Sequence, residues 1–473
     1  MSARFAALDV TAALGVDPTS LPDPGAVFER VTLDSRRTAA DDLFVAIRGE
    51  RHDGNAFLAA AVREGATGAV GEDRRFEARG EIAFWPVEDG RGALQRLAHY
   101  HRRRLSTTVV GVTGSNGKTT TKELIAAVLA QAFRTVRTEG NLNNQIGVPL
   151  TLLSIDVHDR WAVVEMGMNR PGEIAPLAAI SEPSIGVLTN VAASHLEGVG
   201  SIEAVLEEKL ALARALGPGD LLVYCGDQAI LREAVKTLRC RTLSYGLEAE
   251  NDLVPDSWSL DEEGRGAFVL EGRTYRLRLA GRHNVVNALA AVAVGREAGL
   301  SPGRIAVGLA EPDTLPMRMQ LERWGEVVAL VDCYNANPES VLSAAATLTS
   351  LGGARRRIAV LGEMLELGER SEALHQEVGR GLSGSVDLVV IVGEGAAPIA
   401  DGAESAGLES RLFADRGGAI AWLSDHVEPG DALLFKASRG AALETVVGAV
   451  RAACLDAAAN GAAARGSTSG RGR

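Results

Sequence analysis

The stretch TVVGVTGSNGKTTTKELIAAVLAQAF, residues 108–133, decides the fold class. Its first six residues, which end at Thr113, are mostly β-branched and are typical of a strand. From Lys118 onward the apolar residues recur with the spacing of a helix. The intervening GSNGK contains glycines that let backbone N–H groups converge on phosphate oxygens at the start of a helix. This order of strand, glycine loop and helix predicts a phosphate-binding loop.

The predicted loop places Lys118 to meet the β- and γ-phosphates of a nucleotide and Thr119 to ligate Mg²⁺. The match to GxxxxGK[ST] is not strict, because Val112 rather than Gly111 stands at the first glycine position. The alternative is a glycine-rich turn with an exposed lysine. Because strand, GxxGKT and helix occur together, we expect ATP or GTP to bind. The loop residues expected to contact the nucleotide are Thr113, Gly114, Ser115, Asn116, Gly117, Lys118, Thr119 and Thr120.

Apolar runs alternate with helical stretches through the rest of the chain. After the loop, strands are predicted at 161–166, 184–191 and 220–225, hairpins within 250–280, and an Ala-rich helix over 281–300. Strands that alternate with helices predict a parallel sheet covered on both faces. We therefore predict an α/β fold with three domains and a disordered tail. These are a small α/β UDP-binding domain at 1–104, a central P-loop-type mononucleotide-binding parallel-sheet domain at 105–314, a C-terminal Rossmann-like α/β domain at 315–456, and the tail at 457–473.

Composition narrows the class of partner and the compartment. The formal charge is −12, from 61 acidic and 49 basic residues, which argues against nucleic acid or an anionic membrane as the main partner. The four cysteines are widely spaced, which favours a reducing compartment. The N-terminus does not resemble a signal peptide, and no apolar run is long enough to span a bilayer. We expect a soluble, cytoplasmic protein, and a monomer.

Eight segments carry a resemblance to a known family. They are TGSNGKTTTKE, GNLNNQIGVPLTLL, VVEMGMNRPGEI, TNVAASHLEGVGS, GRHNVVNALAA, DCYNANPES, LGEMLELGERSEALH and FKASRG, and together with DSRRTAADDLFVAIRGERHDGNAF they resemble the Mur ligase family. The matches run in order from Asp34 to about Gly440. The resemblance implies ATP-dependent amide-bond formation on a UDP-linked muramoyl peptide, through an acyl phosphate, for peptidoglycan synthesis.

The same resemblance assigns a metal site to residues that look ordinary by themselves. Without the resemblance, Glu165 would be interpreted as a cap or turn residue, His195 as a structural or exposed histidine, and Lys209 as a solvated helix lysine. In the family, the corresponding glutamate and histidine ligate Mg²⁺, so that with Thr119 two ions are expected. The lysine is carbamylated by CO₂ to become an anionic ligand. In the family this lysine often begins the motif KxE, whereas here Lys209 is followed by Leu210 and then by an alanine.

The remaining predicted contacts come from the later motifs. Asn287, one turn after His283, either packs in the core or contacts the nucleotide base, as the resemblance implies. Arg318 and Asp332 would reach the phosphates and ribose from the third domain. The nucleotide site would then be shared by two domains, which must close on each other before the reaction. The predicted catalytic residues are Lys118, Lys209, His195 and Arg318. The predicted substrate contacts are Ser35, Arg36, Asn143, Asn144, Asn335, Lys436, Ser438 and Arg439.

Within the family, the acceptor motifs favour the branch that adds D-alanyl-D-alanine to a UDP-linked muramoyl tripeptide. The DNPR motif of the diamino-acid-adding branch is absent, and FKASRG resembles KGSRG with Ala437 in place of glycine. The third tripeptide residue, lysine or diaminopimelate, stays open. Rival interpretations are the diamino-acid-adding ligase, folylpolyglutamate synthase and a non-catalytic nucleotide-binding scaffold. The UDP-type first domain opposes the second rival, and retention of Lys118, Thr119, Glu165, His195 and Lys209 opposes the third.

Overall fold

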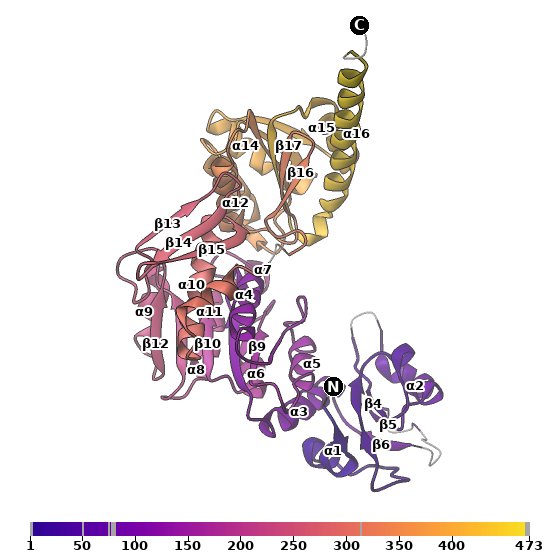
Figure 1. The fold of residues 1–473 in the computed structure, drawn as a ribbon. Helices are drawn as coiled ribbons and strands as arrows, with labels where there is room; N and C mark the ends of the chain where they lie inside the picture. The colour runs from indigo at the N-terminus through magenta and orange to yellow at the C-terminus, as the bar shows by residue number, and fades with distance from the viewer. Residues whose placement is uncertain (1–2, 50–51, 74–75, 77–81, 313–314, 469–473) are drawn as a thin grey trace.

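The computed structural model describes residues 3–49, 52–73, 76, 82–312 and 315–468, and its elements form three units in chain order (Figure 1). The predicted α/β class with parallel sheets is confirmed. The first unit lies at one end of the molecule, the central unit in the middle and the third unit at the other end (Figure 1). Within the described residues no helix is both long and apolar enough to cross a membrane.

The first unit is built on a small parallel sheet in the order β3-β4-β5-β6. Its two inner strands are buried along their whole length, as expected for a sheet packed on both faces. The helix α3 packs on this sheet and also on α5 and α6 of the central unit, so it connects the two units. The elements are β1 (Phe5–Ala6), α1 (Ala7–Leu14), β2 (Val27–Phe28), β3 (Arg30–Thr32), η1 (Ser35–Arg37), β4 (Asp42–Val45), η2 (Gly54–Phe57), α2 (Leu58–Glu64), β5 (Gly68–Gly71), β6 (Ala83–Pro86) and α3 (Gly90–Arg103).

The central unit is a six-stranded parallel sheet in the order β12-β11-β10-β7-β9-β8. Helices α4 and α10 pack together against one face, and α6 and α8 against the other. A three-stranded antiparallel sheet, β13-β14-β15, follows and leads into α10, as the hairpin prediction expected. The elements are β7 (Thr108–Thr113), α4 (Lys118–Ala130), β8 (Thr135–Arg137), α5 (Gly147–Leu153), β9 (Trp161–Glu165), α6 (Ile174–Ser181), β10 (Ile185–Leu188), α7 (Leu196–Val199), α8 (Ile202–Arg214), β11 (Leu221–Cys225), α9 (Ala229–Val235), β12 (Arg241–Tyr245), β13 (Ser257–Leu260), β14 (Arg265–Leu270), β15 (Arg273–Ala280), α10 (Arg282–Glu297) and α11 (Pro302–Leu309).

The third unit holds a second six-stranded sheet in the order β16-β17-β21-β18-β19-β20, parallel except for β16. Helices α12, α13 and α14 form one layer, and α15 and α16 cover the other face (Figure 1). A separate apolar cluster that includes Trp324, Phe435 and Val446 lies in this unit. The elements are β16 (Gln320–Trp324), β17 (Val327–Asp332), α12 (Pro338–Ser350), β18 (Arg356–Gly362), η3 (Gly368–Arg370), α13 (Ser371–Gly381), β19 (Leu388–Val392), η4 (Glu394–Ala396), α14 (Pro398–Ser405), β20 (Glu409–Phe413), α15 (Arg416–His426), β21 (Asp431–Lys436), η5 (Arg439–Ala441) and α16 (Glu444–Thr468).

The C-terminal helix corrects the predicted tail. Disorder was predicted from residue 457, but α16 continues to Thr468, and Figure 1 shows it extending beyond the sheet it covers. The prediction relied on the absence of apolar periodicity in this segment. Its many alanines have the highest intrinsic helix propensity and can propagate a helix that is already anchored by packing. Residues 469–473 lie outside the described residues.

Candidate active site

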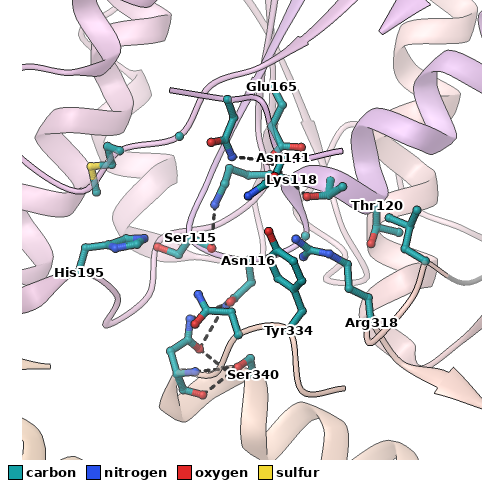
Figure 2. A pocket seen from close by; sticks show the side chains of 18 of the residues that line it. Ser115, Asn116, Lys118, Thr120, Asn141, Glu165, His195, Arg318, Tyr334 and Ser340 are labelled. Atoms are coloured by element: carbon teal, nitrogen blue, oxygen red, sulfur yellow. Dashed lines mark hydrogen bonds between the residues drawn. The ribbon is translucent and has the colours of Figure 1, made fainter. Parts of the chain in front are cut away.

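A cavity of about 650 Å³ lies where residues of all three units meet. Figure 2 shows the phosphate-binding loop and His195 on one side, with Arg318, Tyr334 and Ser340 facing them from the third unit. Most of the predicted site residues line this cavity. They are Ser115, Asn116, Gly117, Lys118, Thr119, Thr120, Asn143, Asn144, Glu165, His195, Asn287, Arg318, Asp332, Asn335 and Lys436. Seven predicted residues do not: Ser35, Arg36, Thr113, Gly114, Lys209, Ser438 and Arg439.

The phosphate-binding loop connects β7 to α4, as predicted. Gly117 has φ of +77°, and a Cβ there would lie 2.6 Å from Asn287 Oδ1, so this position requires glycine. Asn287, on α10, is thereby held against the loop. The Lys118 ammonium donates to the carbonyls of Gly114 at 2.8 Å and Ser115 at 3.1 Å. Enclosure lowers the pKa of Lys118, while the charge of Glu165 opposes that shift.

Glu165, at the end of β9, is 1% exposed, and only one of its two carboxylate oxygens accepts hydrogen bonds from residues that the structure describes. Its Oε1 accepts hydrogen bonds from Asn143 Nδ2 at 2.7 Å and from Thr119 Oγ1 at 3.3 Å. Its Oε2 is buried without a hydrogen-bond partner among the described residues. An anionic oxygen left unsatisfied beside a threonine hydroxyl suits a hard divalent cation. The chemistry of Glu165 and Thr119 therefore fits Mg²⁺.

A buried lysine that the sequence analysis did not single out stands behind this carboxylate. Lys122, one turn after Lys118 on α4, has an exposed fraction of 0%. Its ammonium donates to the carbonyls of Thr138 at 2.7 Å and Gly140 at 3.1 Å, and lies 4.0 Å from Glu165 Oε2. The only signal in the sequence was its helical spacing from Lys118, which does not tell a buried lysine from an exposed one.

His195 directly precedes α7 and has a left-handed backbone, with φ of +56°. Its Nδ1 lies 2.5 Å from Glu366 Oε2 of the third unit. The close contact with His195 lowers the pKa of Glu366. The imidazole lines the cavity and extends toward the phosphate-binding loop (Figure 2). Among the described residues no group of three or more His, Cys, Asp or Glu side chains could hold a metal, so a metal here would also need hydroxyl or modified-lysine ligands.

Lys209 lies on α8, whose first turn is capped by Ser201. It is 1% exposed, and burial lowers its pKa well below the usual value, with the nearby charge of Lys118 acting in the same direction. Without the family resemblance, Lys209 was expected to be a solvated helix lysine. The structure shows that it is buried.

The third unit supplies cations and amides to the cavity. The Arg318 guanidinium lies over the Tyr334 ring, 3.9 Å from its centroid. Lys436, only 2% exposed, donates to Asp332 Oδ2 at 2.6 Å, so a predicted substrate contact is paired with a predicted nucleotide contact. Outside the cavity, Ser438 accepts from the Leu365 N–H at 2.9 Å. Arg439 likewise lies outside, where it contacts Met317 and Glu444.

The first unit contributes two arginines that the sequence analysis did not single out. Arg48 and Arg91 line the cavity, and Arg91 donates to Gln145 Oε1 at 2.9 Å. Ser35 and Arg36, the predicted UDP contacts, lie in η1, where Arg36 pairs with Asp34 at 2.9 Å. Arg48 belongs to the quoted first-domain segment, but the segment alone does not show which of its arginines faces the cavity.

Comparisons with known proteins agree along the whole chain. Family models match as the Mur ligase family catalytic domain over residues 27–102, the Mur ligase middle domain over 112–295 and the Mur ligase glutamate ligase domain over 317–439. A UDP-N-acetylmuramoyl-tripeptide–D-alanyl-D-alanine ligase from Bacillus subtilis is 37% identical, covering 89% of this chain and 93% of that protein. The Escherichia coli protein of the same name is 34% identical, covering 89% and 94%.

Solved structures give the same result. A crystal structure of MurF from Acinetobacter baumannii superposes with a TM-score of 0.87 at 30% identity, covering 95% of this chain and 99% of that one. MurF from Thermotoga maritima, solved in complex with ADP, gives 0.81 at 31% identity, covering 90% and 98%. With three family models in order and relatives of this similarity over nearly its full length, the chain belongs to the Mur ligase family.

Proposed function

We propose that this chain uses ATP to join D-alanyl-D-alanine to a UDP-linked N-acetylmuramoyl tripeptide, releasing ADP and phosphate. The names of its relatives support the substrates. The observation that carries the proposal is the cavity itself, in which a phosphate-binding loop faces Arg318 and Lys436 from another unit. The three units would act as domains at 1–104, 105–314 and 315–456, in a cytoplasmic monomer.

The reaction requires activation of a carboxylate, which is a poor electrophile at neutral pH. Transfer of the γ-phosphoryl group of ATP to the tripeptide carboxylate gives an acyl phosphate and ADP. The amine of the dipeptide then attacks the acyl carbon, and phosphate leaves with the electron pair of the broken C–O bond. Lys118 and Arg318 offset the charge on the transferring group. Asn287 and Asp332, which both line the cavity, would position the nucleotide base and ribose.

Magnesium is the ion that the buried Glu165 and Thr119 would hold, with His195 and Lys209 as the ligands of a second ion. When bound, it neutralises phosphate charge. Lys209 supports this scheme because burial lowers the pKa of its amine and so favours the neutral form, which is nucleophilic toward CO₂. Addition of the amine to CO₂ forms an N–C bond and releases one proton, and converts a would-be cation into an anion. The departure from KxE after Lys209 does not alter this chemistry.

The substrates would enter from the two outer units. The first unit would bind UDP through Ser35 and Arg36, and Arg48 and Arg91 of the same unit line the cavity. Asn143, Asn144 and Asn335 line the same cavity between the loop and the third unit. Lys436, Ser438 and Arg439 would form the acceptor side, where the FKASRG motif favours the dipeptide.

The test is ATP-dependent phosphate release with UDP-muramoyl tripeptides carrying either lysine or diaminopimelate, with and without D-alanyl-D-alanine. Release that needs the dipeptide, with a product that gains its mass, is the expected result. Lys118→Ala should abolish it, while Lys236→Ala, an exposed lysine on the same unit, should not. Turnover only of UDP-muramoyl dipeptide with a free diamino acid would overturn the proposal in favour of the preceding step.

A further inference from the structure

The side chain of Glu366, in the third unit, contacts His195, a predicted metal ligand of the central unit. Glu366 belongs to the LGEMLELGE motif, to which the proposed reaction assigns no role. Its carboxylate lies 2.5 Å from Nδ1 of His195, whose imidazole is 16% exposed. The two residues are far apart in sequence and belong to units joined by a linker, so their contact depends on how the units are placed.

The contact is built into the backbone of both segments. The N–H of Glu197 donates to the carbonyl of Glu366 at 3.0 Å. Gly368 has φ of +60°, and a Cβ there would lie 3.2 Å from the Cα of Glu197, so a larger residue would push the two segments apart. Both His195 and Glu366 adopt left-handed backbone conformations, which L-residues other than glycine rarely do. Two residues with strained backbones and a close glycine contact indicate that α7 and η3 pack together in a specific way.

The contact with Glu366 constrains the imidazole. Two acceptor atoms would repel each other at 2.5 Å, so the carboxylate favours a proton on Nδ1. The lone pair is then on Nε2, the nitrogen left to bind a cation. Histidines that ligate metals commonly donate their other N–H to a carboxylate, which sets the tautomer and orients the ring.

We infer that Glu366 is a positioning residue that orients His195 for metal binding and makes that orientation depend on docking of the third unit. Metal affinity and closure are then coupled through one contact, because separation of the units removes the carboxylate from the imidazole. This inference rests on the proposed role of His195 as a metal ligand. It adds a residue from another unit to that site.

The test is Mn²⁺ binding followed by electron paramagnetic resonance, with a non-hydrolysable ATP analogue present. Glu366→Ala should weaken binding about tenfold or more, the range found when such supporting carboxylates are removed. Glu366→Gln should restore part of the affinity, because its amide oxygen still accepts from Nδ1–H. Glu369→Ala removes the same charge three residues away and is the matched control. The melting temperature of each variant tests whether the effect is structural.

Two results would count against the inference in different ways. Equal Mn²⁺ affinity in Glu366→Ala and Glu369→Ala, with His195→Ala still weakened, would overturn the role of Glu366 alone. Unchanged Mn²⁺ binding in His195→Ala would overturn the metal role of the histidine and the inference with it. Neither result bears on ligase activity measured by phosphate release, so failure of the proposed function stays distinguishable.

Discussion

The side-chain amides of Asn116 and Asn337 form a reciprocal pair across the boundary between the central and third units. Asn337 Nδ2 donates to Asn116 Oδ1 at 2.7 Å, and Asn116 Nδ2 lies 3.3 Å from Asn337 Oδ1. Asn116 is in the phosphate-binding loop, and Asn337 caps α12 by accepting from the N–H of Ser340 at 2.9 Å. The start of α12 is therefore tied to the loop that would hold the phosphates.

Asn337→Ser should separate these two roles. Serine is an equally good helix cap but is too short to reach Asn116, so the unfolding free energy should fall by about 1 kcal/mol, the net contribution of one hydrogen bond. Because the phosphate-binding loop then loses its contact with α12 and is less ordered before binding, ATP binding should also weaken. Isothermal titration calorimetry measures the affinity. Ser301→Ala, which removes the cap of α11 away from the cavity, should lower the melting temperature without affecting ATP. The reverse pattern would contradict the interpretation.

Lys122→Met should destabilise the protein more than a lysine substitution usually does. It leaves the carbonyls of Thr138 and Gly140 without their buried donor and removes the cation nearest to Glu165 Oε2. Breaking a buried charged contact costs about 3 kcal/mol. Urea unfolding should detect this loss. Lys236→Met, at an exposed lysine paired with Glu233, should cost under about 1 kcal/mol, and equal costs at the two positions would refute the argument.

His283→Gln should remove a part of the acid sensitivity of folding. Burial between α10 and α12 lowers the pKa of His283 to about 4, although Asp332 opposes the shift, and its Nδ1 lies 3.1 Å from Ser343 Oγ. The folded state thus binds fewer protons than the unfolded chain between about pH 6.5 and pH 4. Stability is fully present above pH 6.5 and is lost as the pH falls through this window. Urea unfolding across the window should show a shallower decline for the variant than for the native chain. His158→Gln, at an exposed histidine, should leave the decline unchanged.

The fold could be predicted from the sequence where a strand is buried on both faces of its sheet. Strands such as β9 and β10 were predicted because both of their faces are covered and their sequences are continuous apolar runs, and the glycine loop indicated where the nucleotide site lies. The short edge strands β8, β16 and β20 were missed, because exposed polar side chains interrupt their apolar pattern. The end of α16 was missed for the opposite reason, since alanine propensity extends a helix without any apolar period.

Most of the residues that line the cavity could be named from the sequence, but the contacts between them could not. Glu165 and His195 came from the family resemblance, and both line the cavity. Lys122, Arg48 and Glu366 lie in the quoted segments, but nothing local shows which other segment each one contacts, because a charged residue on a helix or loop is expected to be solvated until the fold brings another segment against it. The contacts that matter most here join different units, and the sequence of one segment does not specify its neighbour in another.

Lys209→Met should separate the cost of the buried amine from the effect of carbamylation. Burial lowers the pKa of Lys209 well below 10.5, so below pH 10.5 the unfolded chain binds a proton that the folded state does not. Stability therefore falls as the pH drops from 10.5 toward the folded pKa, and methionine removes that loss. In CO₂-free buffer the variant should melt higher than the native chain, by more at about pH 8 than at about pH 10. Added bicarbonate should raise the melting temperature of the native chain only, because carbamate forms on the folded state. A ¹³C resonance of the carbamate, seen with labelled bicarbonate, should be absent in the variant. An equal response of both proteins to bicarbonate would mean that CO₂ acts elsewhere and that Lys209 is only a buried amine.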